Sequence, residues 1–290
     1  METVLLCRGL RKAYREFTLD NVSLAIPKGA IKGLIGPNGA GKTTTIRILM
    51  NQARADAGEV EIFGLRYPAA EKPIKNRIGF VGVEQFFYLN KSVGWTGRFV
   101  AQYYDRWDEN RFDSLLMRFK LSRTKKTCEL SRGMKVKLAF AIALAHDPDL
   151  LILDEPTSGL DPVIRRELLD LLRDVSRTEG KSVLISSHIT DDLARIADEI
   201  AFMHEGRIIL ESAKDDLLAN WKRVHFRPGS IPSAVVAALT GVENHVFGSS
   251  GITRDFPSIR GALDAAPRED VKVENINLDD ILIALVGKGV

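Results

Sequence analysis

The feature that most constrains the fold of this 290-residue chain is a glycine-rich loop, Gly36-Pro37-Asn38-Gly39-Ala40-Gly41-Lys42-Thr43. The loop has the spacing G-x-x-x-x-G-K-[ST], follows an apolar strand pattern at Ile31–Ile35 and precedes a helical pattern at Thr44–Met50. Glycines allow successive backbone N–H groups to turn toward one anion, and a helix start adds unpaired donors with a partial positive charge. A glycine-rich turn without a ligand is the alternative, but the complete motif in this setting favours a phosphate-binding loop.

A loop of this kind binds the phosphates of a nucleotide together with Mg²⁺. Lys42 can reach the β- and γ-phosphates, and the hydroxyl of Thr43 can ligate the metal. We therefore predict a nucleotide and Mg²⁺ as cofactors, bound by the loop residues and by Thr44, which follows them.

Two acidic residues, Asp154 and Glu155, follow directly after the apolar run Leu150–Leu153. Carboxylates at the end of a buried strand are costly unless a cation or hydrogen bonds compensate them, and a Mg²⁺–nucleotide supplies that compensation. Asp154 is then expected to hold the metal or its water, and Glu155 to polarise the attacking water as a general base. Taken alone, the pair could also be a strand end with a charged turn. The phosphate loop favours the catalytic interpretation.

His188 ends the sequence Ser186-Ser187-His188, directly after another apolar strand pattern. A single histidine at such a place usually has a structural role. In a sheet whose neighbouring strand ends at Asp154 and Glu155, however, it is well placed to touch the γ-phosphate or to orient Glu155.

Strand and helix patterns alternate up to about residue 215, which predicts an α/β domain with a parallel sheet. After that point Pro228, Gly229 and Pro232 interrupt the chain, strand patterns are weak, and an apolar helix is expected at Leu278–Val286. We therefore predict a nucleotide-binding domain at residues 1–215 and a small α+β appendage at residues 216–290, for which regulation, dimerisation and capping of the core are the alternative roles.

Charge, cysteine content and hydropathy exclude several classes of protein. A net charge of +3 is too small for a strong nucleic-acid footprint, so we expect no nucleic-acid partner. The two cysteines, Cys7 and Cys128, lie far apart, which fits a reducing compartment and predicts neither a disulfide framework nor a metal cluster. The longest apolar run, Leu138–Ala145, is much shorter than the ~20 residues of a spanning helix. Any membrane contact is therefore expected to go through a partner.

Together, these motifs resemble those of the ABC (ATP-binding cassette) ATPase family over roughly residues 3–215. The run Leu130-Ser131-Arg132-Gly133-Met134 stands at the place of the family's LSGGQ signature, and Ser158-Gly159-Leu160-Asp161 resembles its D-loop. His188 matches the switch histidine, and Tyr14 is similar to the aromatic residue that stacks on adenine. The resemblance implies an α/β P-loop NTPase core with a helical signature subdomain and an antiparallel β subdomain.

The signature departs from the family pattern at two positions. Arg132 replaces a glycine and Met134 replaces a glutamine. Ser131 and Gly133, whose hydroxyl and backbone would meet a γ-phosphate, are retained. The extra charge of Arg132 could touch a phosphate or point to solvent, and the sequence leaves both open.

A third departure lies in the segment that resembles the Q-loop. After Ile78-Gly79-Phe80-Val81-Gly82, the usual glutamine position is filled by Val83, with Glu84 and Gln85 next. Gln85 is our candidate for the contact with Mg²⁺ and water. If Val83 holds the family position, Glu84 could substitute for the glutamine, or the contact is lost.

Aromatic residues are concentrated between Phe80 and Phe119, which holds eleven of the 21 in the chain. By resemblance, this segment receives a helix of a membrane partner, so we predict that Phe86, Phe87 and Tyr88 contact that partner. A core of the helical subdomain is the alternative explanation for many of these aromatic residues.

The resemblance also implies a mechanism. One ATP lies between the phosphate loop of one subunit and the signature of another, where Ser131, Gly133 and Asp161 are expected to complete the site. This chain has one loop and one signature, so a second copy or a paralogue must supply the other half. The resemblance is to bacterial ATPases of ABC-2 type exporters, which implies a cytoplasmic subunit held at the inner face of the cell membrane by an integral permease. The alternative is a soluble ABC ATPase in a non-transport role such as cluster assembly.

Overall fold

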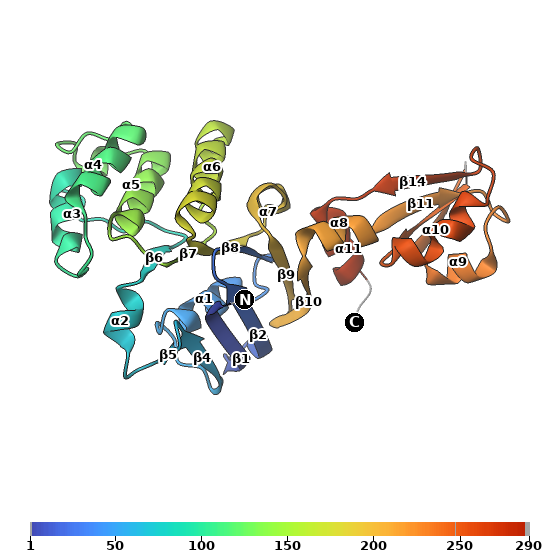
Figure 1. The fold of residues 1–290 in the computed structure, drawn as a ribbon, viewed down its shortest axis with the longest axis horizontal. Coiled ribbons are helices and arrows are strands. Elements are labelled where there is room, and N and C mark those ends of the chain that lie inside the picture. Colours follow the sequence, from blue (N-terminus) through green and yellow to red (C-terminus); the bar gives the residue numbers. More distant parts are fainter. Residues whose placement is uncertain (1, 247, 288–290) are drawn as a thin grey trace. The chain divides into compact units, whose positions relative to one another are not determined.

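The structure is a computed structural model that describes residues 2–246 and 248–287. The chain divides into two compact units, Met1–Leu210 and Glu211–Val290. Figure 1 colours the first unit from blue to yellow and the second in orange and red. Among the described residues, no helix is long and apolar enough to cross a membrane.

The first unit is built on a six-stranded sheet with the strand order β10-β9-β3-β8-β7-β6. Neighbouring strands from β9 to β6 run parallel. Every residue of β3, β7 and β8 is buried, which explains why their sequences are mostly apolar and do not alternate with exposed polar residues. The strands are β3 (Ile31–Ile35), β6 (Ile78–Val81), β7 (Leu150–Asp154), β8 (Ser182–Ser187), β9 (Glu199–His204) and β10 (Arg207–Ala213).

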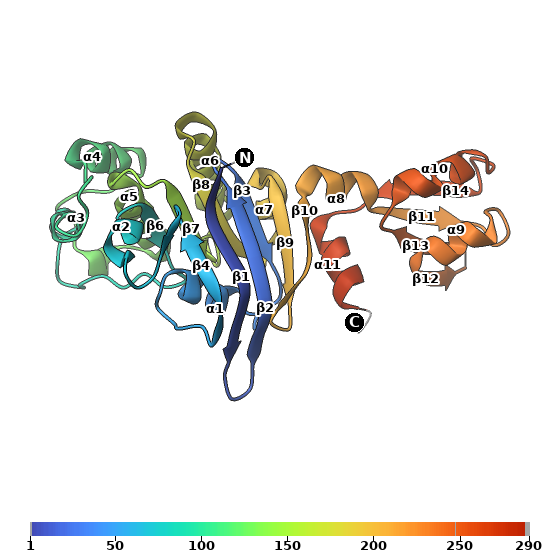
Figure 2. The ribbon, with the colours of Figure 1, turned by 60° about the horizontal axis from the view of Figure 1, so that its bottom comes forward.

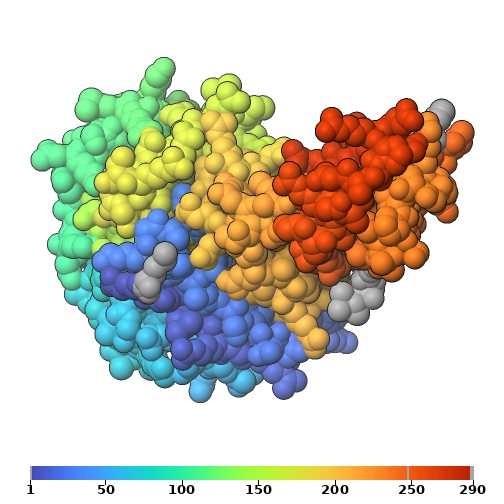
Figure 3. Space-filling view, turned by 45° about the vertical axis from the view of Figure 1, so that its right-hand side comes forward, coloured from blue at the N-terminus to red at the C-terminus, as the bar shows by residue number. Residues whose placement is uncertain are grey.

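A second, antiparallel sheet of the first unit has the order β2-β1-β4-β5. Its strands are β1 (Thr3–Ala13), β2 (Thr18–Pro27), β4 (Ala57–Ile62) and β5 (Leu65–Arg66). The long pair β1 and β2 is seen along its length in Figure 2, and the N-terminal part of the chain, which includes this sheet, forms the blue surface in Figure 3. Apolar side chains of the sheet share one core with helix α1 (Lys42–Leu49) and with β7. This sheet is the antiparallel β subdomain that the sequence predicts.

The helices between β6 and β7 lie together (green in Figure 1) and form the expected helical subdomain. They are α3 (Val93–Ala101), α4 (Glu109–Arg118) and α5 (Arg132–Ala145), preceded by the short α2 (Glu71–Lys75) after β5. α3 and α4 approach so closely that a Cβ at Gly97 would clash with the ring of Phe112. Two more helices, α6 (Pro162–Glu179) and α7 (Thr190–Ile196), follow β7 and β8.

The second unit contains a four-stranded antiparallel sheet with the order β12-β13-β11-β14. The sequence of elements from β11 to β14 is β-α-β-β-α-β, the ferredoxin-like arrangement. The unit has its own core, which includes Val224 and Phe226 from β11 and Ile259 from α10. Its elements are α8 (Lys214–Asn220), β11 (Lys222–Phe226), α9 (Ser233–Ala238), β12 (Thr240–His245), β13 (Gly248–Thr253), α10 (Phe256–Asp264), β14 (Val271–Asn275) and α11 (Leu278–Val286).

Candidate active site

The glycine-rich loop connects the end of β3 to the start of α1, as the sequence predicts. Gly39 and Gly41 have φ values of +83° and +112°, which favour glycine over any residue with a Cβ. A Cβ at Gly36 would clash with the carbonyl oxygen of Met203 on the neighbouring strand β9. The loop conformation therefore depends on these three glycines.

Lys42 turns its ammonium group back over the loop that precedes it. Its Nζ donates to the carbonyl oxygens of Gly36 at 2.7 Å and Pro37 at 3.1 Å. The same Nζ lies 3.1 Å from Oε1 of Glu155, and the Lys42 side chain is 5% exposed. A buried ammonium needs a nearby anion, and a phosphate group can take the place of the carboxylate.

The acid pair stands where β7 ends. Asp154 accepts a 2.6 Å hydrogen bond from the hydroxyl of Ser186 on the neighbouring strand β8. Glu155 has a φ of +49°, an uncommon conformation for a residue other than glycine, and such strain persists only where the surroundings enforce it. Its Oε1 is buried without a hydrogen-bond partner of good geometry, although the Lys42 ammonium is close. A water molecule can donate a hydrogen bond to the free lone pairs of this atom.

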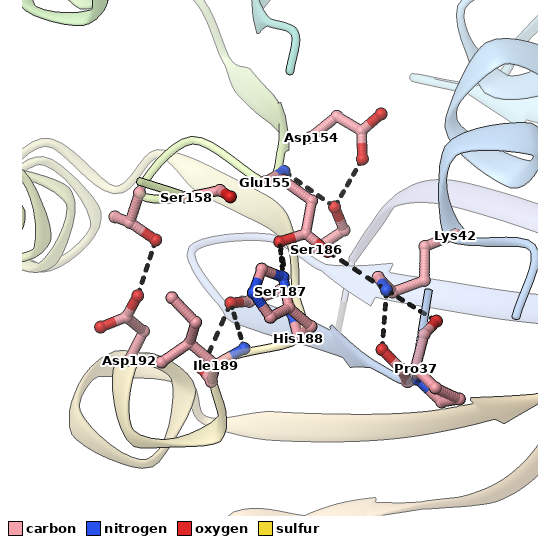
Figure 4. Close-up of polar contacts among 12 residues, drawn as sticks. Pro37, Lys42, Asp154, Glu155, Ser158, Ser186, Ser187, His188, Ile189 and Asp192 are labelled. Carbon is pink, nitrogen blue, oxygen red and sulfur yellow. Dashed lines mark hydrogen bonds and ion pairs between the residues drawn. The ribbon is translucent and has the colours of Figure 1, made fainter. Parts of the chain in front are cut away.

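His188 follows β8 and lies against Glu155 (Figure 4). Its Nδ1 is 2.6 Å from Oε2 of Glu155, and its backbone N–H donates to the same oxygen at 3.3 Å. An imidazole that donates from Nδ1 fixes the direction of the carboxylate. The sequence analysis considered two roles for His188, touching the γ-phosphate and orienting Glu155. The structure contains the contact that the second role requires.

The oxygen ligands near the loop fit a magnesium ion. Mg²⁺ prefers carboxylate and hydroxyl oxygens and keeps several of its waters. Asp154 is buried at the end of β7, and Thr43 is half-buried in the first turn of α1. The donor set that these two residues offer is therefore of the right chemistry.

The signature run forms the start of α5. The hydroxyl of Ser131, the exposed N-cap residue, accepts from the backbone N–H of Met134 at 3.3 Å. Gly133 faces α6, where an added Cβ would lie 2.5 Å from Cδ1 of Ile164. The close approach of α5 and α6 thus requires glycine at position 133.

Arg132 is exposed and makes a contact within its own chain. Its Nη2 donates to the carbonyl oxygen of Ser158 at 2.7 Å, so it binds the D-loop segment of its own chain. The guanidinium covers Gly159, where a Cβ would lie 2.5 Å from Nη1. The contact depends on how α5 and α6 pack, and no local sequence pattern reports it.

Replacing Arg132 by Gly should lower the free energy of unfolding by about 1–2 kcal/mol, because one hydrogen bond is lost and glycine is added to a helix. Turnover of ATP should change little, since the Arg132 contact is intramolecular. Chemical denaturation and phosphate release would measure the two effects, with Arg118→Gly as the control, because Arg118 makes only an exposed ion pair with Asp174. A large loss of turnover at unchanged stability would instead place Arg132 on the nucleotide.

The remaining predicted residues lie on separate loops. Asp161 caps α6 by accepting from the backbone N–H groups of Val163 and Ile164, each at 3.0 Å. Tyr14 follows β1 and is 47% exposed, with Lys12 Nζ 5.8 Å from its ring centroid. Gln85 donates from Nε2 to the carbonyl oxygen of Gly82 at 2.7 Å, within its own loop. Among the residues that the structure describes, no hydrogen bond or ion pair joins Gln85 or Tyr14 to Lys42.

The sequence analysis did not single out two groups that support the site. Ser186 supplies the hydroxyl that holds Asp154 and also accepts from the backbone N–H of Glu155 at 3.0 Å. Thr157 and Asp192 form a second, buried hydrogen bond behind the acid pair. In the structure, the β7–β8 register pairs Ser186 directly with Asp154.

Comparisons with known proteins find relatives of this chain. The family model described as ABC transporter matches residues 19–158. The bacitracin transport ATP-binding protein BcrA of Bacillus licheniformis is 32% identical over 100% of this chain and 99% of its own length. The lantibiotic transport ATP-binding protein SrtF of Streptococcus pyogenes is 37% identical over 73% of this chain and 92% of its own length.

Solved structures show the same fold. The structure of an ATP-binding subunit of an ABC transporter matches with a TM-score of 0.69 and 27% identity, over 75% of this chain and 92% of that chain. The dimeric cassette MJ0796, bound to ADP and Pi after hydrolysis, matches in fold with a TM-score of 0.66 at 23% identity, over 72% of this chain and 98% of that chain. With an identity of 32% to a relative along its whole length, the chain belongs to the ATP-binding subunits of ABC transporters, a family of ATPases.

Proposed function

We propose that this chain binds Mg-ATP, hydrolyses it at a site completed by a second subunit, and thereby drives an export permease. One observation carries the proposal of catalysis. The carboxylate of Glu155 contacts Lys42 of the phosphate loop through one oxygen and His188 of the switch position through the other. This arrangement brings a phosphate-binding cation, a general base and an orienting imidazole to one place.

Each residue then has a defined task. Lys42 would exchange Glu155 and the loop carbonyls for the terminal phosphates of ATP. Thr43 and Asp154 would hold Mg²⁺, which supplies charge neutralisation at the phosphates when bound. Glu155 would accept a proton from the attacking water, and His188 would keep its carboxylate directed. The protein therefore works by positioning and electrostatics, as is general for phosphoryl transfer.

The second subunit is needed because the signature lies on the surface. Ser131 is exposed at the start of α5, whereas the phosphate loop of the same chain follows β3, an inner strand of the sheet. We propose that a second copy or a paralogue presents its signature to the ATP held here. ATP would hold the two chains together, and hydrolysis would release them.

The names of relatives favour transport, and export in particular, over the non-transport alternative. The Nod factor export ATP-binding protein I of Paraburkholderia xenovorans is 34% identical over 73% of this chain and 71% of its own length. The bacitracin and lantibiotic relatives are also named for transport. We propose the same class of work for this chain, at the cytoplasmic face of a membrane and bound to an integral permease.

An exposed aromatic surface on the helical subdomain is the proposed permease contact. Phe86 is 86% exposed and Tyr88 is 59% exposed. The ring of Tyr88 meets Trp95 and Phe99 edge-on, each at 5.5 Å, and the latter two stack at 5.1 Å. Exposed aromatic groups of this kind mark protein interfaces. Phe87 is partly buried, so Phe86 and Tyr88 carry this proposal.

Co-purification with a co-expressed candidate permease tests the permease contact. The double variant Phe86→Ala/Tyr88→Ala should weaken capture by about tenfold or more, because interface aromatic residues each contribute ~1 kcal/mol or more. ATP hydrolysis by the isolated subunit should stay near the parent value. Met117→Ala, which removes another exposed apolar side chain, is the control. Unchanged capture by the double variant would contradict the assigned surface without touching the ATPase proposal.

Tyr14→Ala should reduce discrimination between ATP and GTP and weaken ATP binding by about tenfold, since stacking of a base on an aromatic ring contributes ~1–3 kcal/mol. Calorimetric titration with each nucleotide measures the effect. Tyr103→Ala is the matched control, because Tyr103 is 63% exposed and belongs to the helical subdomain. Equal discrimination in Tyr14→Ala and in the parent would mean that another group stacks on the base.

A further inference from the structure

A buried hydrogen bond joins the segment that carries Glu155 to the segment that carries His188. The hydroxyl of Thr157 donates to Oδ2 of Asp192 at 2.6 Å. Figure 4 labels Asp192 and, near it, the Glu155–His188 contact. Thr157 is 1% exposed and Asp192 is 2% exposed. The bond is therefore shielded from water, where a hydrogen bond to a charged acceptor is strong.

The other oxygen of Asp192 is also used. Its Oδ1 pairs with Nε of Arg165 on α6, and Asp192 itself lies in the first turn of α7. A buried carboxylate is costly unless both oxygens find partners, and here a hydroxyl and a guanidinium satisfy them. One side chain thus fastens three segments: the loop after β7, α6 and α7.

Two hydrogen bonds link the segment Glu155–Thr157 to the segment His188–Asp192, so the two segments and the two bonds form a closed ring. One is His188 Nδ1 to Glu155 Oε2 at 2.6 Å, and the other is Thr157 to Asp192. Only Pro156 separates Glu155 from Thr157 in the chain, and three residues separate His188 from Asp192. Moving the Thr157 end of the ring therefore moves the Glu155 end as well.

The backbone of Glu155 needs such support. Its φ of +49° is unfavourable for a residue with a Cβ, so a relaxed loop would let the carboxylate turn away. The short parallel strands β7 and β8 fix the loop on one side through Ser186. The Thr157–Asp192 bond fixes it on the other.

We propose that Asp192, acting through Thr157, is a positioning residue for ATP hydrolysis: it keeps the Glu155 and His188 segments in register so that the carboxylate faces the attacking water. The inference rests on the proposed general-base role of Glu155. Neither Asp192 nor Thr157 is placed in contact with the nucleotide, and the phosphate loop lies outside the ring.

The matched pair Thr157→Val and Thr157→Ser tests the proposal. Valine keeps the shape but lacks the hydroxyl, so kcat should fall about tenfold while KM for ATP stays within about twofold, because a small misplacement of a catalytic group lowers the rate of the chemical step. Serine retains the hydroxyl and should restore kcat to within about twofold of the parent. Thr178→Val is the control, since it removes an exposed Thr178–Asp174 hydrogen bond on α6. Asp192→Asn, measured in the same way, serves if Thr157→Val does not fold.

Coupling to His188 separates positioning from a general loss of structure. In a His188→Ala background, Thr157→Val should have little further effect on kcat, because the contact that it supports is already gone. Effects that multiply independently, or equal losses of kcat and ATP affinity in Thr157→Val, would overturn the proposal. Turnover that persists in Glu155→Gln would contradict the general-base role of Glu155, whatever the result for Thr157→Val. Failure of the general-base role can therefore be distinguished from failure of the positioning role.

Discussion

Glu155→Gln is expected to lower steady-state ATP hydrolysis by about 100-fold or more, the usual loss when a general base is removed. Glutamine keeps the length and shape of the side chain and can still accept from His188, but it cannot take a proton from water. The carboxylate also competes with phosphate for Lys42, whose Nζ lies 3.1 Å away. Removing that negative charge should preserve ATP affinity or raise it.

Phosphate release and sedimentation velocity of Glu155→Gln, each with and without Mg-ATP, measure these effects together. Blocked hydrolysis should trap a dimer that forms only with Mg-ATP. Glu179→Gln is the matched control, since Glu179 forms its ion pair with Arg111 at the far end of α6. Normal turnover would contradict the assignment of Glu155. A monomer that still binds ATP would show that a different chain supplies the second signature.

The parts of the site that the sequence predicts well are those in which chemistry and local structure coincide. The phosphate loop is contiguous, and its glycines, strand and helix can be recognised together. The Glu155–His188 contact joins residues far apart in the chain, yet it follows from the sheet. β7 and β8 are parallel neighbours with Asp154 opposite Ser186, so their carboxyl ends meet.

Contacts that depend on how helices pack against their neighbours could not be predicted from the sequence, because no local pattern indicates them. Arg132 reaches Ser158 only because Gly133 lets α5 approach Ile164 of α6. In the sequence, Asp192 resembles an ordinary acidic residue in the first turn of a helix. Only the structure shows that its carboxylate is buried and bonded to Thr157. Likewise, the sequence does not predict the β-α-β-β-α-β order of the second unit. Its strands β12 and β14 are mostly exposed and lack the alternation of apolar and polar residues that is typical of half-buried strands.

Lys42→Ala is the second change with a large expected effect, and it should act on binding and on stability. ATP affinity should fall by about 100-fold, because a charge-assisted contact with phosphate contributes up to ~3 kcal/mol. Removing Lys42 also leaves Oε1 of Glu155, a side chain only 10% exposed, without its nearby cation. Breaking a buried ion pair in this way should lower the free energy of unfolding by up to about 3 kcal/mol.

The double variant Lys42→Ala/Glu155→Gln separates the two effects. If the lost stability arises from an uncompensated carboxylate, the second substitution should restore most of it, because the buried charge is gone. ATP affinity should not recover, since the cation that meets the phosphates is still missing. Denaturant unfolding and calorimetric ATP titration of both single variants, the double variant and Lys42→Arg give the full comparison. Parental ATP affinity in Lys42→Ala would refute the phosphate-binding role of the loop, and a double variant as unstable as Lys42→Ala would refute the pairing with Glu155.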